Sequence, residues 1–295
     1  MNRSPEVVVV GGGVMGCSIL YNLAYQGMNN AVLLEQEVLG WGSSSRGNSI
    51  IRMHYSNEVT TLLARDSLQI FKDFDQIVGG DPEFSVVGWL LVVGQNDQTA
   101  MEKNVRMQTT LGVNTKLVTP DEIRQIIPDI ALNTGEAGTF EPDAGTANPL
   151  KATRAYGERA QDLGAQIKFG IQVVGIDVQG GHVTGVITNQ GKISTSAVVL
   201  ATGPWSQRLF TNMGIPAPFK SIRHSVVALH YPETAPDGLP TVNDVVHSFS
   251  ARPSGRVSLV GVGEEEEVNA DDYDQGIDPD IGAMTLSSVS KRLPS

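Results

Sequence analysis

Three glycines near the start of the chain have the spacing G-x-G-x-x-G, which can hold a pyrophosphate. They are Gly11, Gly13 and Gly16. Gly11 permits a sharp turn, Gly13 lets backbone approach phosphate oxygens, and Gly16 allows a helix to pack closely on a strand. Glu35 follows 19 residues after Gly16, where a carboxylate can accept hydrogen bonds from ribose hydroxyls. These residues predict dinucleotide binding, and a purely structural glycine turn is the alternative.

The elements around these glycines have the order strand, turn, helix, strand. Residues 7–10 are a continuous run of valines, typical of a strand buried on both faces of a parallel sheet. Apolar residues then recur at helical spacing from Val14 to Ala24, and residues 31–35 form a second short strand. The helix would present its N-terminal amides to a bound phosphate. The chain is therefore predicted to open with a βαβ unit.

The rest of the chain mixes helical patterns with short strands. Thr119, Pro120 and Glu122 predict a capping box that opens a short helix. Other helices are expected over residues 58–78, 96–111, 149–163, 206–213 and 281–293. One or two strands are expected over 84–93, an antiparallel meander over 166–169, 172–178, 182–188 and 192–195, a buried strand over 197–201, and antiparallel strands over 222–230, 245–250 and 256–262.

Composition excludes several classes of function. The net charge is −11, from 21 basic and 32 acidic residues, so no overall positive field attracts nucleic acid. Cys17 is the single cysteine, which favours a reducing compartment. No apolar run approaches the ~18 residues that a membrane span needs, and the first residues lack the basic start of a signal peptide. We expect a cytoplasmic protein with no nucleic-acid partner, no membrane span and no metal site.

The segment after the second strand favours a flavin over a nicotinamide. Residues 40–48, with the sequence GWGSSSRGN, offer backbone amides, hydroxyls and the cation of Arg46 to a cofactor. A nicotinamide-binding domain normally continues with further βα units, and a β-meander is foreign to it. A nicotinamide-dependent dehydrogenase that shares only the glycine turn is the alternative.

Five segments together resemble a known family. They are VVVVGGGVMG (7–16), GSSSRGNSIIRMHY (42–55), FEPDAGTANP (140–149), RAYGERAQDLGA (154–165) and VVLATGPWSQRL (198–209). In this order they resemble the flavin-dependent oxidoreductases of the D-amino-acid oxidase superfamily, in particular the monomeric sarcosine oxidase and glycine oxidase-like enzymes. The resemblance covers nearly the whole chain, and I-I-R after G-S together with A-T-G-P-W is its most specific part.

The resemblance implies FAD as cofactor. Glu35 would bind the adenosine ribose, Ser43 and Ser44 would lie by the phosphates, and Val173 or Val174 would meet the adenine through its backbone. The residues expected to hold FAD are Gly11, Gly13, Val14, Met15, Gly16, Glu35, Gln36, Gly42, Ser43, Ser44, Arg46, Asn48, Ser49, Ile50, Val173, Val174, Ala201, Thr202, Gly203 and Trp205.

The resemblance also implies a reaction. A small amino acid or N-methyl amine, such as sarcosine or glycine, would be oxidised at its C–N bond by hydride transfer to the flavin. Arg52 matches the family arginine that pairs with the substrate carboxylate, and a planar guanidinium can bind a carboxylate through two hydrogen bonds. An ordinary ion pair is the alternative for Arg52. No general base is assigned, and His54 is interpreted as an ordinary polar residue.

Some positions depart from the family pattern. Ser49 stands where sarcosine oxidases carry another arginine, Ser250 replaces an aromatic residue, and residues 257–263 lack the lysine that helps oxygen react in that branch. The electron acceptor is therefore left open between oxygen and another carrier, including an electron-acceptor protein. The chain also ends before a segment that family members use to close over the flavin, so it resembles a truncated member. A catalytically incomplete fragment, or a subunit that needs a partner chain, is the second alternative.

The expected architecture is α/β, with two interleaved domains. Residues 1–80 and 145–219 would form a Rossmann-type FAD-binding domain with a β-meander. Residues 81–144 and 220–295 would form a substrate domain built on a mixed, largely antiparallel sheet.

Overall fold

The computed structural model describes residues 4–233, 238–276 and 278–294. The opening of the chain lies in a parallel four-stranded sheet of order β13-β1-β2-β9. Its strands are β1 Val7–Val10, β2 Ala31–Leu34, β9 Gln166–Lys168 and β13 Ala197–Leu200. The predicted βαβ unit is confirmed, because α1 (Val14–Tyr25) connects β1 to β2.

The two faces of this parallel sheet are covered by different elements. Val7 and Val9 pack with α1 and with α6 (Pro149–Asp162), whereas Val8 and Val10 face the meander. Successive side chains of a strand point to opposite faces, so the valine run is buried on both sides. Burial on both faces thus explains why this strand consists of valines throughout and does not alternate between apolar and polar residues.

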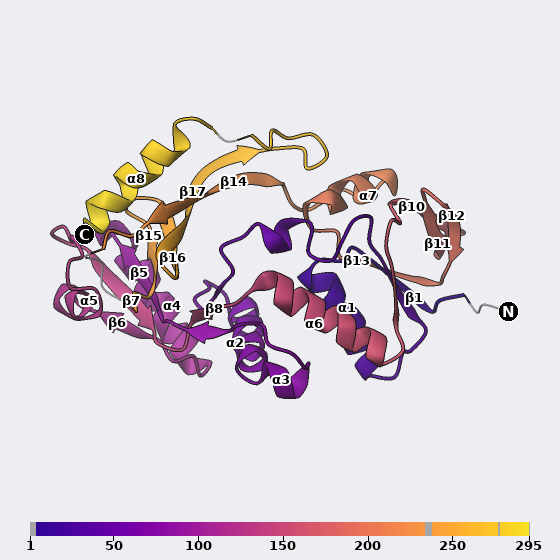
Figure 1. The fold of residues 1–295 in the computed structure, drawn as a ribbon, viewed down its shortest axis with the longest axis horizontal. Coiled ribbons are helices and arrows are strands. Elements are labelled where there is room, and N and C mark those ends of the chain that lie inside the picture. Colours follow the sequence, from indigo (N-terminus) through magenta and orange to yellow (C-terminus); the bar gives the residue numbers. More distant parts are fainter. Residues whose placement is uncertain (1–3, 234–237, 277, 295) are drawn as a thin grey trace.

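A seven-stranded mixed sheet forms the other large layer, in the order β14-β17-β16-β15-β5-β7-β6. Its strands are β5 Trp89–Val93, β6 Lys116–Val118, β7 Ala137–Glu141, β14 Ile222–His230, β15 Thr241–Asp244, β16 Phe249–Ser254 and β17 Val257–Glu267. Helices α5 (Pro120–Ile126) and α8 (Ile281–Arg292) lie near one apolar face, and α4 (Gln98–Thr110) packs on the other. The two large sheets lie toward opposite ends of the long axis (Figure 1).

A small antiparallel sheet lies between them and carries the segment of most interest. It has the order β3-β8-β4, with β3 Ile50–Ile51, β8 Gly145–Thr146 and β4 Ser85–Val86. β3 comes directly after the Gly/Ser loop, which contains a short 3₁₀ turn over Ser43–Ser45. The loop therefore leads from the parallel sheet toward the seven-stranded sheet. The proposed division of the chain at residues 80, 144 and 219 stays a prediction.

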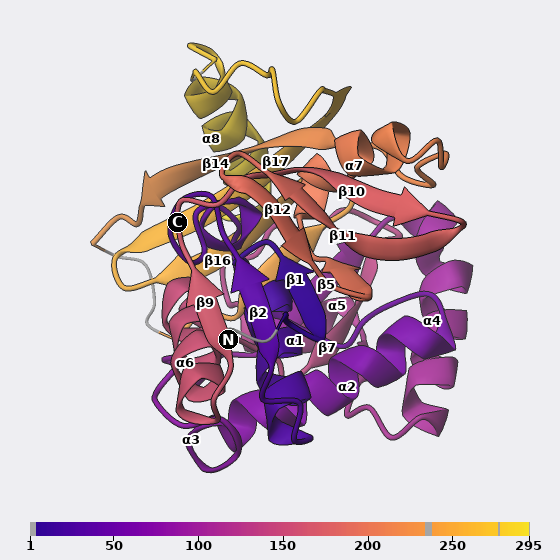
Figure 2. The ribbon, with the colours of Figure 1, turned by 90° about the vertical axis from the view of Figure 1, so that its right-hand side faces the viewer.

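The predicted meander is wrong in its first strand. Only β10 (Val173–Gln179), β11 (His182–Thr188) and β12 (Gly191–Ser194) form the antiparallel meander. β9 instead pairs in parallel with β2, and Figure 2 shows β9 and β2 side by side while the meander strands group apart from them. Strand patterning predicts an extended segment but not its partner, because the partner is decided by the α6 crossover that precedes β9.

The predicted strand over residues 245–250 is wrong over 245–248, and only its last two residues lie in a strand, β16. Val245 to Ser248 connect β15 to β16, and Asp244 accepts hydrogen bonds from the backbone N–H groups of Val246 and His247 at 2.8 and 3.0 Å. Ser248 has a φ of +54°, a left-handed conformation that ends a strand. The aspartate side chain thus stabilises a turn at a place where two valines favoured the prediction of a strand.

Two helix predictions have different outcomes. The helix expected over residues 58–78 is divided at Asp73 into α2 (Glu58–Lys72) and α3 (Phe74–Ile77). The capping box is confirmed, since Glu122 N–H donates to Thr119 Oγ1 at 3.3 Å and Thr119 N–H donates to Glu122 Oε2 at 2.8 Å. The remaining helical elements are α7 (Ser206–Asn212) and short 3₁₀ turns at Gln95–Asp97 and Gly203–Trp205.

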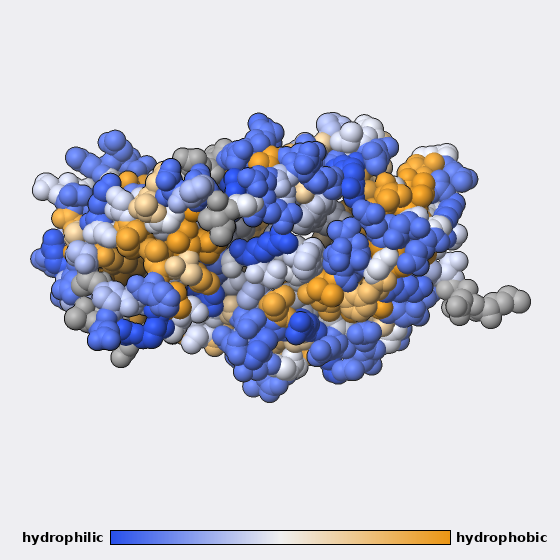
Figure 3. Space-filling model, turned by 45° about the horizontal axis from the view of Figure 1, so that its top comes forward, coloured by the Kyte–Doolittle hydropathy of each residue, from blue (hydrophilic) through white to orange (hydrophobic). Residues whose placement is uncertain are grey.

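The surface combines hydrophilic side chains with separate apolar patches (Figure 3). Glu266 and Glu267, at the end of β17, are exposed and pair with Arg223 and Lys220 across the edge of the sheet. Within residues 4–233, 238–276 and 278–294, no helix has the length and apolar character to cross a membrane.

Candidate functional site

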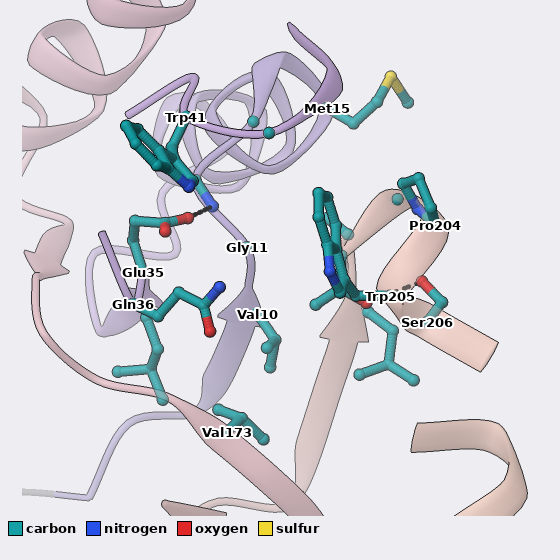
Figure 4. A pocket seen from close by; sticks show the side chains of 18 of the residues that line it. Val10, Gly11, Met15, Glu35, Gln36, Trp41, Val173, Pro204, Trp205 and Ser206 are labelled. Carbon is teal, nitrogen blue, oxygen red and sulfur yellow. Dashed lines mark hydrogen bonds between the residues drawn. The ribbon is translucent and has the colours of Figure 1, made fainter. Parts of the chain in front are cut away.

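A cavity of about 620 Å³ lies at the carboxyl ends of β1, β2 and β13. This is where open parallel sheets bind their ligands, and the volume suits a small-molecule cofactor. Glu35 and Gln36 lie on one side of Gly11, and Pro204 and Trp205 lie on the other (Figure 4). The predicted residues that line the cavity are Gly11, Gly13, Val14, Met15, Glu35, Gln36, Gly42, Ser43, Ser44, Val173, Ala201, Thr202, Gly203 and Trp205.

The glycine turn leaves no room for side chains at two positions. A Cβ on Gly11 would lie 2.6 Å from the carbonyl oxygen of Ala201, and the φ of Gly11 is +105°. A Cβ on Gly16 would lie 1.9 Å from the carbonyl oxygen of Gly11. Glycine is therefore required at Gly11 for the turn and at Gly16 for close packing of α1 on the turn. Ser44 Oγ meanwhile accepts a hydrogen bond from Val14 N–H at 3.0 Å and ties the Gly/Ser loop to the start of α1.

Glu35 is held in place by the chain itself. Its Oε2 accepts a hydrogen bond from Gly12 N–H at 2.6 Å, and its Oε1 accepts one from Glu37 N–H at 2.8 Å. The residue is almost completely buried and lines the cavity. A carboxylate oxygen has two acceptor positions, so each oxygen keeps one for a hydroxyl donor. The carboxylate is thus preorganised for a vicinal diol such as a ribose.

Part of the cavity wall is formed by residues outside the predicted set. Trp41, Gln172 and Ser206 line it together with Gly12 and the aliphatic side chains of Val10, Ile19, Leu34, Ile171, Leu200 and Leu209. Arg208 also lines it and forms an ion pair with Asp271 at 2.8 Å. Several of these positions, such as Gly12 and Trp41, lie inside the segments that predicted the site, whereas Gln172 and Ile171 reach the cavity only through tertiary packing.

Six of the predicted cofactor residues do not line the cavity. Arg46 donates a 2.9 Å hydrogen bond to Tyr273 Oη and stacks on Trp41, with 5.5 Å between its Cζ and the ring centroid. Asn48 bonds Ser250 Oγ at 3.2 Å, which connects the loop to β16. Val174 is exposed, so of the two valines only Val173 reaches the cavity. The remaining positions outside the cavity are Gly16, Ser49 and Ile50.

Arg52 lies away from this cavity, just after β3. Its guanidinium stacks on two aromatic rings, with 4.7 Å from Cζ to the Tyr55 centroid and 5.2 Å to the Trp89 centroid. It also donates a hydrogen bond to the carbonyl oxygen of His54. No carboxylate of the described residues lies within ion-pair distance of it. Among the described residues, the guanidinium is thus held by two aromatic rings and a backbone carbonyl oxygen, and its role stays a prediction.

A fully buried glutamate, Glu141, and a mostly buried histidine, His54, lie close to the Arg52 segment. Glu141 is fully buried, and its Oε2 accepts a 2.8 Å hydrogen bond from Met53 N–H. Its Oε1 lies 3.9 Å from His54 Nδ1, and neither atom has a hydrogen-bond partner among the described residues. Burial raises the pKa of Glu141 to about 7, and burial lowers the pKa of His54 to about 4. Sequence reasoning assigned no role to either residue.

Within the ranges that the structure covers, no group of three or more His, Cys, Asp and Glu side chains is placed to hold an ion.

Comparison with protein families identifies the fold as that of a known flavoprotein group. The model of the family described as "FAD dependent oxidoreductase" matches residues 6–295. The chain belongs to this family. The family's cofactor is FAD, and the predicted resemblance to the D-amino-acid oxidase superfamily is confirmed. The glycine cradle, the preorganised Glu35 and the cavity between them fit FAD as they fit any dinucleotide, and the family match decides against the nicotinamide alternative.

Curated relatives of this family member oxidise amines. The chain is 34% identical over 265 residues to 4-methylaminobutanoate oxidase (formaldehyde-forming) of Paenarthrobacter nicotinovorans, covering 88% of this chain and 32% of the relative. It is 30% identical over 236 residues to sarcosine oxidase subunit beta of Arthrobacter sp, covering 77% of this chain and 57% of the relative. The chain thus spans about one third to over half of the length of these relatives. The predicted C-terminal truncation stays a prediction.

Solved structures confirm the α/β fold class. L-proline dehydrogenase from P. horikoshii superposes with a TM-score of 0.87 at 26% identity, over 100% of this chain and 78% of that chain. Glycine oxidase from Bacillus cereus ATCC 14579 superposes with a TM-score of 0.78 at 21% identity, over 99% of this chain and 78% of that chain, which shows the likeness of fold.

Proposed function

We propose that this chain is the FAD-binding and substrate-binding part of an oxidoreductase that acts on the C–N bond of a small amino acid or N-methyl amine. The observation that carries the proposal is the glycine cradle with Glu35 fixed beside it by Gly12 and Glu37. When bound, FAD would supply the redox chemistry, as the acceptor of a hydride. The names of the relatives, which include a methylaminobutanoate oxidase and a sarcosine oxidase subunit, support this substrate class.

Different residues of the chain bind the cofactor and the substrate. Gly11 and Gly13 give the backbone access to the pyrophosphate, and Glu35 accepts hydrogen bonds from ribose hydroxyls. Arg52 binds the substrate carboxylate, because its stacked guanidinium has a cationic edge that no carboxylate of the described residues pairs with. The amine must be neutral to lose a hydride, and no general base is assigned.

The first experiment measures the visible absorption spectrum of the purified 295-residue chain before and after FAD is added. We expect the bands of a bound flavin, and we expect an N-methyl amino acid to bleach them in the absence of oxygen. A chain that stays colourless after excess FAD has been added and the unbound FAD removed contradicts the proposal that this chain alone holds the cofactor.

Arg52→Ala tests the substrate clamp in the FAD-loaded protein. We expect KM for a carboxylate-bearing amine to rise about 100-fold, since a charge-assisted bidentate pair contributes about 3 kcal/mol. Arg52→Lys keeps the positive charge but loses the planar guanidinium. Its KM should lie between those of the wild type and Arg52→Ala. Arg106→Ala, on the exposed face of α4, is the matched control and should leave KM unchanged.

A partner subunit is the second candidate requirement. The likeness to a protein named as a subunit of sarcosine oxidase favours it. In this case the chain alone would bind FAD weakly, and a co-expressed partner chain would restore the flavin bands. The electron acceptor is tested in the same preparation, by comparing reoxidation of the bleached protein by oxygen with reoxidation by an artificial acceptor.

A further inference from the structure

The most unusual feature outside the cofactor cavity is the buried carboxyl group behind Arg52. Glu141 ends β7, where it lies opposite Trp89 of β5 in the ladder of the seven-stranded sheet. Its side chain has no exposed surface, yet one of its oxygens has no hydrogen-bond partner among the described residues. A buried polar atom without a partner destabilises a protein, so a role for this carboxyl group is to be sought.

We propose that Glu141 is a positioning residue that controls carboxylate binding at Arg52. In its neutral form it holds the Arg52 segment in place and leaves the guanidinium charge free, and in its anionic form it competes with the substrate carboxylate for that charge. This inference rests on the proposed role of Arg52 as the substrate clamp.

The positioning part follows from a direct contact. Glu141 Oε2 accepts the hydrogen bond of Met53 N–H, the residue next to Arg52. Trp89 is the ladder partner of Glu141 and also stacks on the Arg52 guanidinium. The carboxyl group of Glu141 thus fixes the backbone beside Arg52, and the ring of Trp89 fixes the Arg52 side chain. The two residues lie on the paired strands β7 and β5. An uncharged acceptor at position 141 suffices for this contact.

The charge part follows from what surrounds the carboxyl group. The charged groups that act on Glu141 are Arg52, from the segment after β3, and Asp143, from the turn after β7. His54 is the nearest titratable ring, but burial and the charge of Arg52 lower its pKa to about 4, so it is neutral near pH 7. Gln108 of α4 is uncharged, and its side-chain N–H donates to the carbonyl oxygen of Tyr55. Arg52 is therefore the cation available to an ionised Glu141.

The carboxyl group changes its charge in the range where Arg52 stays positive. Burial raises the pKa of Glu141 to about 7, although the Met53 hydrogen bond and the charge of Arg52 act in the opposite direction. A substrate carboxylate at Arg52 adds a second negative charge to the site and raises this pKa further. By linkage, carboxylate binding near pH 7 takes up protons, and the affinity falls as the pH rises.

The test uses a ligand with one unchanging charge. Methoxyacetate resembles an N-methyl amino acid but has an ether oxygen in place of the amine, so its charge is constant from about pH 6 to about pH 9. Its Kd for the full chain is measured over this range by ligand-detected NMR, with methoxyacetamide as the uncharged control. Proton uptake is measured by calorimetry in two buffers of different ionisation enthalpy. The variants are Glu141→Gln, which keeps an acceptor for Met53 N–H, and the matched Glu102→Gln on the exposed face of α4.

We expect the affinity of the wild-type chain for methoxyacetate to fall about tenfold from pH 6 to pH 9, since a coupling of one pKa unit equals a factor of ten. Glu141→Gln should bind with the low-pH affinity throughout and take up no proton, and Glu102→Gln should behave as the wild type. A pH-independent wild-type affinity, or a slope that survives in Glu141→Gln, overturns the role of Glu141 while the clamp stands. Methoxyacetate binding that is absent, or unaffected by Arg52→Ala, instead overturns the clamp and this inference with it.

Discussion

The backbone N–H of Gly12 donates a 2.6 Å hydrogen bond to Glu35 Oε2, across 23 positions of the sequence. The contact joins the glycine turn after β1 to the carboxyl end of β2. It orients the glutamate toward the cavity before any ligand arrives, and a second bond from Glu37 N–H completes the arrangement. A preorganised acceptor loses little entropy on binding, so we expect the affinity of the site for a ribose to depend on this pair of residues.

Glu35→Gln tests this dependence. The NH₂ group of the new glutamine side chain would face a backbone N–H, so that two donors would oppose each other. The ribose would also lose an anionic acceptor. We expect the affinity for FAD to fall about tenfold to 100-fold, because a lost or unsatisfied buried hydrogen bond corresponds to about 1–3 kcal/mol. The measurement is a titration of flavin fluorescence. Glu37→Gln, on an exposed neighbour, is the matched control, and an equal loss in both variants would contradict the assigned role.

Gly16→Ala tests the packing of α1 on the glycine turn. The new Cβ would lie 1.9 Å from the carbonyl oxygen of Gly11, so the helix must move away from the strand. We expect the free energy of unfolding in urea to fall by about 3 kcal/mol or more. Gly282→Ala in α8 is the control, because nothing lies within 4 Å of its Cβ, and it should be neutral or stabilising by up to about 1 kcal/mol. Comparable losses in the two variants would refute the packing argument.

Glu141→Gln tests the pH dependence of stability without any ligand. The folded-state pKa of about 7 lies above the ordinary value of 4.5, so the folded chain binds more protons than the unfolded chain between these values. This group therefore makes the protein less stable as the pH rises from about 4.5 to 7, by about 3 kcal/mol at most.

The measurement is the free energy of unfolding in urea at about pH 5 and about pH 8. Glu141→Gln should lose less stability than the wild type over this interval. If the two proteins lose the same amount, the carboxyl group does not titrate in this range.

Arg292 anchors the last helix to the seven-stranded sheet. It is fully buried, and it pairs with Glu136 and Asp244 at 2.5 Å each. Arg292→Met leaves both carboxylates buried without their cation, so we expect a loss of about 3–5 kcal/mol in the free energy of unfolding. Lys291→Met, on the exposed neighbouring position, should change it little. A small effect of Arg292→Met would show that the carboxylates find water when the cation is removed.

Local patterns predicted the parts of the fold whose partners are close in sequence. The valine run, the glycine turn and the first helix form one βαβ unit, and the Thr119 capping box closes within three residues. Residues 166–169 were correctly predicted as a strand but were placed in the wrong sheet. Their partner β2 lies more than a hundred residues earlier, and edge pairing of that kind has no local signal.

The sequence by itself predicted a dinucleotide cofactor, because the turn, its helix and Glu35 lie within a few tens of residues and each has a local physical reason. It also determined the family, through motifs in a fixed order. Only the tertiary structure decided which side chains surround Arg52. Glu141 and Trp89 lie next to Arg52 because β7 pairs with β5 in register, and burial then shifts the pKa of the carboxyl group. Burial and charge act through space, so they become defined only when distant strands pair.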